Sequence, residues 1–446
     1  MSHVLHRNIN TSVPIVESAD GNYLIDENGK RYLDASGGAA VSCLGHTNQR
    51  VINAIKDQLD KVSFAHTGVF SNTAAEELAT YLIKNTPDGF GNGRAMFLGS
   101  GSEAMEAALK LARQYHLEKG DKARSKIIAR DRSYHGNTLG ALATGGHKQR
   151  QAPFAPLLID VLHIPPCYAY RFKDENETPE QFGIRMANIL EEEILKQGPE
   201  TVAAFVAEPV SGASLGAEPA APGYFERIRE ICDQYGVLFI ADEVMCGIGR
   251  TGYLFALEAE GVSPDIFTIA KGLGAGYQPI AAVLANEKII NSIQAGSGNL
   301  WNGHTYMSHA IACAGALAVL KVIEEDQLLG NVSSQGRKLE KMLRNEFENH
   351  PNIGDIRGRG LFWGLEIVEN KETKEPFPSE ANLSAKIKKD ILENGMLSYP
   401  SNGCVDGIRG DHILLAPPYT VTDDELVTIV DTVKICLNNQ LGKLKS

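Results

Sequence analysis

Lys271 and Asp242 are the two residues of this chain whose types and positions most directly suggest chemistry. Lys271 follows the largely apolar run 266–270, and Asp242 follows the apolar run 238–241. If both runs are buried strands of one sheet, an ammonium and a carboxylate meet at the edge where ligands of α/β proteins bind. A carboxylate in that position is costly to bury unless it is paired. The alternative for Lys271 is a solvated lysine that ends a strand.

Pyridoxal phosphate is a cofactor that needs both groups. A lysine binds its aldehyde, and a carboxylate keeps its ring nitrogen protonated, which makes the ring an electron sink. Lys271 is therefore predicted to form a Schiff base and then to move a proton between substrate and cofactor. A lysine must lose its own proton for this work, so burial should lower its pKa. Asp242 is predicted to be the carboxylate on the ring nitrogen.

Ser100, Gly101 and Ser102 lie between the apolar run 95–98 and a predicted helix over 103–118. Small residues at a helix N-terminus leave backbone N–H groups free for an anion, and the helix dipole adds to the attraction. These residues therefore predict a phosphate site based on Gly101 and Ser102. An ordinary serine N-cap is the alternative.

A glycine-flanked turn contains Tyr134 and His135 and follows the predicted strand 126–129. An aromatic side chain at this edge of the sheet can stack on a flat cofactor ring. A packed loop aromatic is an equally open interpretation of Tyr134. His135 is placed beside the cofactor and is interpreted as a structural histidine rather than a general base.

Three further residues are candidate cofactor contacts, each with a plain structural alternative. Glu208 ends a neighbouring apolar run and could orient the ring substituents, or it could be a hydrogen-bonded structural carboxylate. Val244 could lie on the ring face opposite Tyr134, or it could be a core valine. Thr305, in a short polar turn, could donate to the phosphate or cap a helix.

The elements that must position these residues alternate between short apolar runs and amphipathic helices. The runs cover 95–98, 126–129, 157–163, 202–207, 237–241, 266–270 and 280–284, and the helices lie near 103–118, 183–197, 223–235 and 306–324. This alternation predicts an α/β fold with a mostly parallel sheet between helices, and ligands beyond the carboxyl ends of its strands. The large domain is predicted to cover 66–325, and 1–65 with 326–446 to form a smaller α+β domain.

The composition excludes several other classes of protein. With 446 residues, 43% hydrophobic and 22% charged, the chain is expected to be globular. The net charge of −12 without a basic stripe argues against a nucleic-acid partner. Seven cysteines without Cys-x-x-Cys predict neither a metal site nor a disulfide framework. The N-terminus does not resemble a signal peptide and no run is long enough to span a membrane, so a cytoplasmic location is expected.

The motifs together resemble the class III aminotransferases, a pyridoxal-phosphate-dependent family. The carrying stretches, in the family's order, are 100–104 (Ser-Gly-Ser-Glu-Ala), 134–136 (Tyr-His-Gly), 208–210 (Glu-Pro-Val), 238–244 with 249–252 and 270–272, 303–306 (Gly-His-Thr-Tyr) and 358–361. The resemblance implies a fold type I transferase with a seven-stranded sheet in its large domain. It also implies a homodimer with active sites at the interface, in which Thr305 reaches the phosphate of the neighbouring subunit's cofactor.

Departures from the family pattern narrow the expected substrate. Ala213 stands where 4-aminobutyrate and ornithine members typically have a glutamate, and Asn137 stands where 4-aminobutyrate members tend to have an arginine. Both differences resemble members that act on ω-amines or ω-amino acids with pyruvate as acceptor. Arg409 is the candidate for the family's substrate-carboxylate arginine, although a surface turn is nearly as good an interpretation.

The resemblance therefore implies an aminotransferase that moves an amino group from an ω-amine or ω-amino acid to pyruvate or a similar 2-keto acid. A ping-pong mechanism through Lys271 is expected, with small-molecule amines and keto acids as partners. A diaminopelargonate-type or 4-aminobutyrate-type aminotransferase is an alternative. Another is a non-transaminating enzyme on the same scaffold, such as an aminomutase, a racemase, a phospholyase or a decarboxylating relative.

Overall fold

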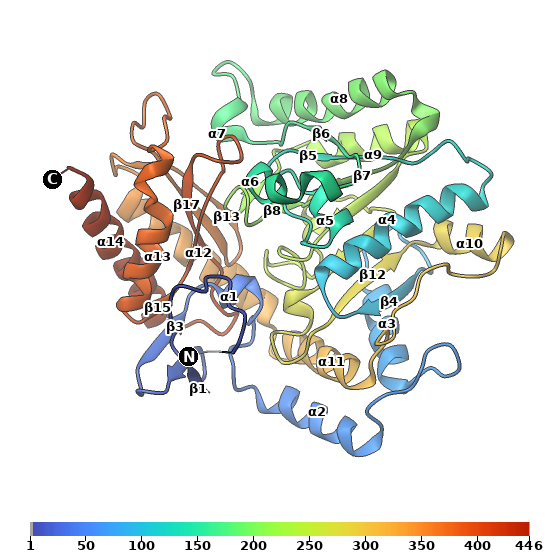
Figure 1. Ribbon diagram of the computed structural model, residues 1–446, viewed down its shortest axis with the longest axis horizontal. Coiled ribbons are helices and arrows are strands. Elements are labelled where there is room, and N and C mark those ends of the chain that lie inside the picture. The colour runs from blue at the N-terminus through green and yellow to red at the C-terminus, as the bar shows by residue number, and fades with distance from the viewer. Residues whose placement is uncertain (1–2, 446) are drawn as a thin grey trace.

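A seven-stranded sheet forms the centre of the protein in the computed structural model, which describes residues 3–445 (Figure 1). In spatial order its strands are β4 (Arg94–Leu98), β12 (Ala281–Ala285), β11 (Ile266–Ile269), β10 (Leu238–Asp242), β7 (Val202–Ala207), β5 (Lys126–Arg130) and β6 (Leu162–Ile164). β12 runs antiparallel to both of its neighbours, and the other pairs are parallel. The predicted α/β fold with a mostly parallel seven-stranded sheet is confirmed.

Helices cover both faces of this sheet, because successive side chains of each strand point to opposite faces. Ile240 packs in one core cluster with α4 (Gly101–Glu118). Phe239, the preceding residue of the same strand, packs in a larger cluster with α8 (Pro179–Gln197) and α9 (Tyr224–Tyr235). Every residue of β10 is buried, which agrees with the apolar sequence of the four residues before Asp242.

Two four-stranded sheets lie beside this layered core (Figure 1). One contains β1 (Val16–Asp20), β2 (Tyr23–Asp26), β3 (Arg31–Asp34) and β15 (Met396–Leu397), and the other contains β13 (Ile353–Arg359), β14 (Phe362–Ile367), β17 (Asp411–Leu415) and β16 (Tyr399–Asn402). Because β3 pairs with β15, segments from the two ends of the chain share a sheet. The predicted grouping of 1–65 with 326–446 gains support from this pairing, and its boundaries stay a prediction.

The other elements connect these sheets. The helices are α1 (Gly37–Ala40), α2 (Gln49–Lys61), α3 (Thr73–Lys84), α5 (Leu139–Thr144), α6 (Lys148–Gln151), α7 (Ala169–Phe172), α10 (Glu287–Ala295), α11 (Ala310–Glu325), α12 (Leu328–Phe347), α13 (Leu383–Glu393) and α14 (Asp423–Lys445), and the short strands β8 (Val210–Ser211) and β9 (Glu218–Pro219) form a hairpin. The run 157–163 was expected to be a strand throughout, but Ala152–Leu157 is a 3₁₀ helix with two prolines, so β6 begins later.

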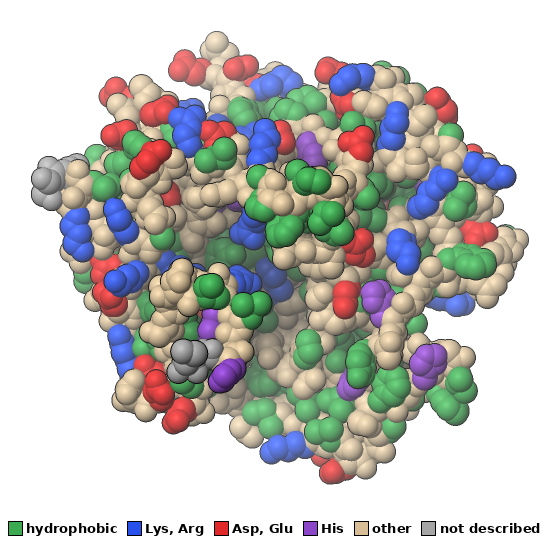
Figure 2. All heavy atoms as spheres, in the orientation of Figure 1, with side chains coloured by type: hydrophobic (Ala, Val, Ile, Leu, Met, Phe, Trp, Pro, Cys, Tyr) green, Lys and Arg blue, Asp and Glu red, His purple; other side chains and the backbone are tan. Residues whose placement is uncertain are grey.

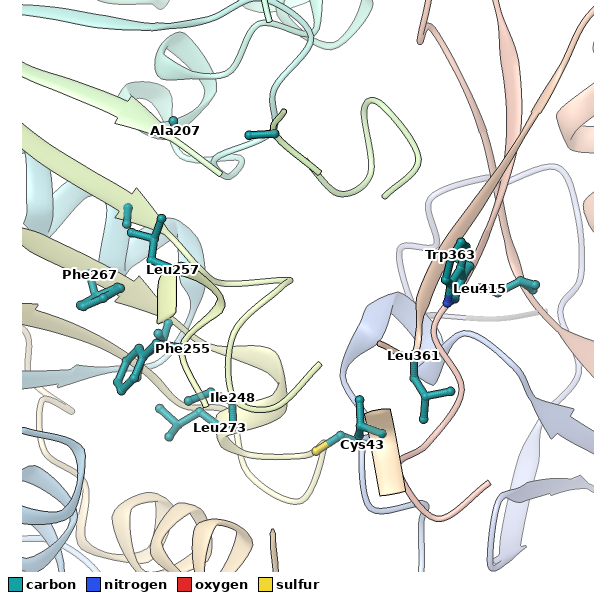
Figure 3. Close-up of a cluster of buried hydrophobic side chains, with 14 of the residues drawn as sticks. Cys43, Ala207, Ile248, Phe255, Leu257, Phe267, Leu273, Leu361, Trp363 and Leu415 are labelled. Atoms are coloured by element: carbon teal, nitrogen blue, oxygen red, sulfur yellow. The ribbon is translucent and has the colours of Figure 1, made fainter. Parts of the chain in front are cut away.

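A buried apolar cluster lies under the carboxyl ends of the central strands (Figure 3). The rings of Phe255 and Phe267 are 4.7 Å apart, and Leu273 packs in the same cluster. The Cys43 thiol donates to the carbonyl oxygen of Gly272 at 3.6 Å, which connects the N-terminal part of the chain to the turn after β11. All seven cysteines are free and buried. Within residues 3–445 no helix is both long and apolar enough to cross a membrane.

Candidate active site

A cavity of about 240 Å³ lies at the carboxyl ends of β10 and β11, beside the N-terminus of α4. It brings together eight residues predicted from the sequence: Ser100, Gly101, Ser102, Tyr134, His135, Asp242, Val244 and Lys271. It is also lined by five residues that sequence reasoning missed or left unassigned: Val41, Ala270, Gln278, Pro279 and Ile280. Residues far apart in the chain therefore meet at the edge of the sheet where a ligand was expected.

Lys271 begins the turn that follows β11 and lines the cavity with its side chain. Its backbone φ of 46° lies in the left-handed region, which costs an L-residue about 1–2 kcal/mol. Burial lowers the pKa of the Lys271 ammonium to about 8, while the nearby carboxylates of Asp242 and Glu208 act in the opposite direction. The interpretation of Lys271 as a solvated strand end is therefore wrong.

Asp242 is held by two hydrogen bonds at the end of β10. Its Oδ2 lies 2.6 Å from Nδ1 of His135, and its Oδ1 accepts from the backbone N–H of Val244 at 3.0 Å. The Asp242 residue is only 3% exposed, so its orientation is fixed by these two partners. Nε2 of His135 is buried without a partner among the described residues, as expected when Nδ1 carries the proton shared with Asp242. His135 therefore positions Asp242, which agrees with its interpretation as a structural histidine.

The N-terminus of α4 supplies free backbone donors to the same cavity. The Ser100 hydroxyl is the N-cap and accepts from the N–H of Glu103 at 3.3 Å, so the N-cap interpretation of Ser100 is confirmed. The N–H groups of Gly101 and Ser102 precede the first intrahelical bonds and have no partner within the helix. A Cβ atom on Gly101 would lie 2.9 Å from Cγ1 of Val244, so only glycine fits there. This turn is shaped to admit a ligand's anionic group to the backbone.

Tyr134 forms one wall of the cavity and is tied to Glu208 behind it. The Tyr134 N–H donates to Oε1 of Glu208 at 3.2 Å, and Glu208 also accepts from the Gly212 N–H at 2.8 Å and the Ser211 hydroxyl at 3.3 Å. Burial raises the pKa of Glu208. Glu208 does not line the cavity. The geometry therefore supports the structural role of Glu208, a hydrogen-bonded carboxylate that fixes the Tyr134 turn, over direct contact with the ring substituents.

The three predicted substrate residues do not line this cavity. Ala213 is buried in a separate apolar cluster. Asn137 is exposed, and its backbone N–H donates to the Ser102 hydroxyl at 2.9 Å. Arg409 is paired with Asp406 at 2.7 Å and Glu375 at 3.1 Å, with 46% of its side chain exposed. The surface-turn interpretation of Arg409 therefore describes this conformation.

Thr305 lies in a second pocket, of about 610 Å³, that borders the first. The two pockets share Gly99, Gln278, Pro279 and Ile280 as walls. Thr305 is not the N-cap of α11, because that position is taken by His309. The helix-cap alternative for Thr305 is therefore wrong, and its hydroxyl has no hydrogen-bonding partner among residues 3–445.

A lysine with a lowered pKa, a buried carboxylate and a glycine-limited anion site at the edge of an α/β sheet define an enzyme that binds an anionic organic cofactor. The class-III aminotransferase family model matches residues 5–437, and the chain belongs to this family.

The chain is similar in sequence to aminotransferases that carry several different names. It is 47% identical to an uncharacterized aminotransferase of Schizosaccharomyces pombe, over 99% of this chain and 96% of the relative. It is 37% identical to gamma aminobutyrate transaminase 3 of Solanum lycopersicum (97% and 82% covered) and 35% identical to adenosylmethionine-8-amino-7-oxononanoate aminotransferase of Nitratidesulfovibrio vulgaris (94% and 76% covered).

Solved structures of omega-transaminases share the fold. One is a thermostable (S)-enantioselective omega-transaminase from Thermomicrobium roseum, with a TM-score of 0.92 and 33% identity over 98% of this chain and 96% of that one. Another is the omega transaminase of Pseudomonas jessenii in complex with PMP, with a TM-score of 0.88 and 35% identity over 96% and 93%.

Class III aminotransferases use pyridoxal phosphate, and the cavity of this chain fits that group. Gly101 leaves room for a ligand beside Val244, where a Cβ would clash. Asp242 presents a buried carboxylate, Lys271 an amine of lowered pKa, and α4 two free N–H groups to one space. The carboxylate complements the cofactor's ring nitrogen, the amine complements its aldehyde, and the N–H groups complement its phosphate.

Proposed function

We propose that this protein transfers an amino group from an ω-amine or ω-amino acid to pyruvate or a similar 2-keto acid in a ping-pong reaction. The observation that carries the proposal is the presence of Lys271, with its lowered pKa, in the same cavity as the buried Asp242 carboxylate. An amine that is partly neutral near physiological pH can bind a carbonyl carbon and can accept a proton.

Each group around the cavity has a role in holding the cofactor. Lys271 would hold its aldehyde, Asp242 its ring nitrogen, and the N–H groups of Gly101 and Ser102 its phosphate. Tyr134 and Val244 would lie against the ring. When bound, pyridoxal phosphate supplies an electron sink that stabilises negative charge on the carbon from which a proton is removed.

Lys271 carries the proton in this scheme. Its Nζ would accept a proton from the substrate carbon that bears the amino group and would return that proton to the cofactor carbon that had carried the aldehyde. The pKa of about 8 means that a useful fraction of the amine is neutral near pH 7–8. His135 and the Val244 N–H would keep the Asp242 carboxylate in one orientation toward the ring nitrogen.

We also propose that the enzyme works as a homodimer in which Thr305 contacts the cofactor phosphate of the neighbouring subunit. Trp301 and Tyr306, on either side of Thr305, are 71% and 68% exposed, which is unusual for large aromatic side chains. A partner subunit on this face would cover them and bring the Thr305 pocket against a second active site.

The test follows the bound cofactor through each half of the reaction. Holoenzyme is mixed with an ω-amine donor, and the visible absorbance of the cofactor should fall and then recover on addition of pyruvate, with one alanine formed per turnover. Lys271→Ala is the control and should give neither change. An unchanged spectrum with every donor would contradict transamination. A product of carbon dioxide, phosphate or an isomer would identify one of the non-transaminating reactions instead.

The donor panel also separates the two nearest alternatives. The relatives named for gamma aminobutyrate and for 8-amino-7-oxononanoate make donors of these two types the first to compare. A preference for 4-aminobutyrate with 2-oxoglutarate, or for adenosylmethionine as donor, would replace the ω-amine proposal.

A further inference from the structure

Arg150 is a cation beside the active site that the proposed reaction does not yet use. It belongs to α6, the short helix after the Gly145-Gly146 turn. Its guanidinium carbon lies 4.8 Å from the centre of the Tyr134 ring. Tyr134 lines the cavity that contains Lys271, so Arg150 lies one side chain away from that cavity without being part of its lining.

The side chain of Arg150 has no hydrogen bond and no ion pair with any residue from 3 to 445. The nearby arginines are satisfied by their own chain. Arg130 donates to the carbonyl oxygen of Glu208 at 2.5 Å, and Arg132 donates to the carbonyl oxygen of Val405 at 2.7 Å. Arg409 is paired with carboxylates. A partly buried guanidinium without an acceptor is uncommon, because its five donors lose hydration and gain nothing in return.

A second arginine, Arg7, is close enough to Tyr134 to act on its phenol. Burial raises the pKa of the Tyr134 phenol, and the positive charges of Arg150 and Arg7 oppose that effect. Arg150 also contributes, behind burial, to the lowered pKa of Lys271. Positive charge therefore lies close to Tyr134 and Lys271, although the whole chain has a net charge of −12. Figure 2 shows Lys and Arg side chains around the hollow in the middle of this face.

The other positions expected to bind or regulate a substrate carboxylate lie outside the lining of the cavity in this conformation. Asn137 and Ala213 carry no charge. Arg409 is held by Asp406 and Glu375. Arg150 is the unpaired guanidinium that lies over the ring of Tyr134, a lining residue of the cavity.

We propose that Arg150 binds the carboxylate of an ω-amino acid donor and so selects donors with an anionic end over plain amines. The inference rests on the proposed transamination and specifies its substrate class. A planar guanidinium pairs with a carboxylate through two parallel hydrogen bonds, which fixes the donor's orientation as well as its affinity. The Tyr134 ring beneath Arg150 holds the guanidinium plane in place by a cation–π contact.

The experiment compares Arg150→Gln with wild type on matched donor pairs. Holoenzyme is mixed with β-alanine or 4-aminobutyrate, and with n-propylamine or n-butylamine, which keep the chain length without the carboxylate. Loss of the cofactor's visible absorbance gives kcat/KM for each donor half-reaction. We expect the variant to lose roughly 10- to 100-fold with the carboxylated donors, the effect of one charge-assisted pair, and less than about 3-fold with the plain amines.

Two further variants identify the source of any effect. Lys148→Gln, on the same helix but exposed and without a contact to Tyr134, controls for general loss of positive charge and should leave the donor preference unchanged. Arg409→Gln tests the other candidate arginine. If Arg409→Gln abolishes the preference and Arg150→Gln does not, the proposal is overturned. A loss confined to the pyruvate half-reaction would assign Arg150 to the keto acid and overturn it as well.

Binding of butyrate, which has a carboxylate but no amine, separates this inference from the proposed function. Calorimetric titration of holoenzyme should show a dissociation constant about 10-fold or more higher in Arg150→Gln than in wild type. If no donor reacts but this difference appears, the carboxylate site stands and transamination fails. Equal butyrate affinity in the two proteins, or no measurable butyrate binding by wild type, overturns the role of Arg150 whatever the reaction.

Discussion

Lys271→Met should make the protein without cofactor more stable near pH 7. Lys271 is partly buried, and the shift of its pKa from the ordinary 10.5 to about 8 means that its charged form is disfavoured in the folded state. A shift of this size corresponds to about 3 kcal/mol, and partial exposure reduces the expected gain to about 2–3 kcal/mol. Methionine fills a similar volume without a charge to desolvate, so this cost disappears.

The pH dependence gives the sharper test of this reasoning. Between pH 8 and 10.5 the unfolded chain binds the Lys271 proton and the folded protein does not, so wild-type stability rises with pH relative to the variant. The stability difference should be full below pH 8 and vanish as the pH approaches 10.5. Urea unfolding of the two apo proteins at several pH values measures it, with Lys148→Met as an exposed-lysine control. A difference that is absent at pH 7, or constant across this range, would refute the burial of an unfavourable ammonium.

Three other substitutions test the remaining parts of the site. Gly101→Ala should weaken cofactor binding by 10-fold or more, because its Cβ would meet a valine methyl at 2.9 Å, whereas Gly303→Ala meets nothing within 4 Å and should bind normally; fluorescence titration with pyridoxal phosphate measures both. His135→Phe should lower kcat by about 10-fold or more, because Asp242 loses the partner at 2.6 Å that orients its carboxylate, and His135→Gln should restore much of the activity in a steady-state assay. Co-expressed Thr305→Ala and Lys271→Ala chains should regain activity that neither has alone if Thr305 serves the neighbouring subunit; no gain would place it in its own site.

The half of the site that holds the cofactor was predictable from sequence, because strands and helix ends leave local signals. Asp242 and Lys271 directly follow apolar runs, and these two runs form the neighbouring parallel strands β10 and β11, which end at the same edge of the sheet. Ser100 precedes a helix with alanine and leucine on one face. Each residue could be placed because its neighbours in the chain define its element.

The rest of the site had no such signal. Val41 and Gln278 line the cavity from irregular segments, and nothing in their neighbours marks them. The environment of Arg409 was not predictable, because its partner Glu375 lies 34 positions away in another loop. Arg150 was missed for a related reason. Arg150 attracts attention because its guanidinium has no hydrogen-bond acceptor among the described residues. The absence of such a contact can be recognised only in the three-dimensional structure.

The residues that would hold the cofactor and the proposed donor-binding residue, Arg150, differ in how substitutions would affect them. Groups that would hold the cofactor are set by strand ends and by glycines whose Cβ positions are occupied, so substitution there disturbs the chemistry itself. Arg150 instead stands on α6, which packs against the loop after β16: the Asn402 amide reaches Gln149 at 3.5 Å, and a Cβ on Gly407 would lie 3.4 Å from Lys148. A change in that loop would move the guanidinium without touching Lys271 or Asp242. If Arg150 selects the donor as proposed, a change in that loop alters donor preference and leaves the groups that would hold the cofactor in place.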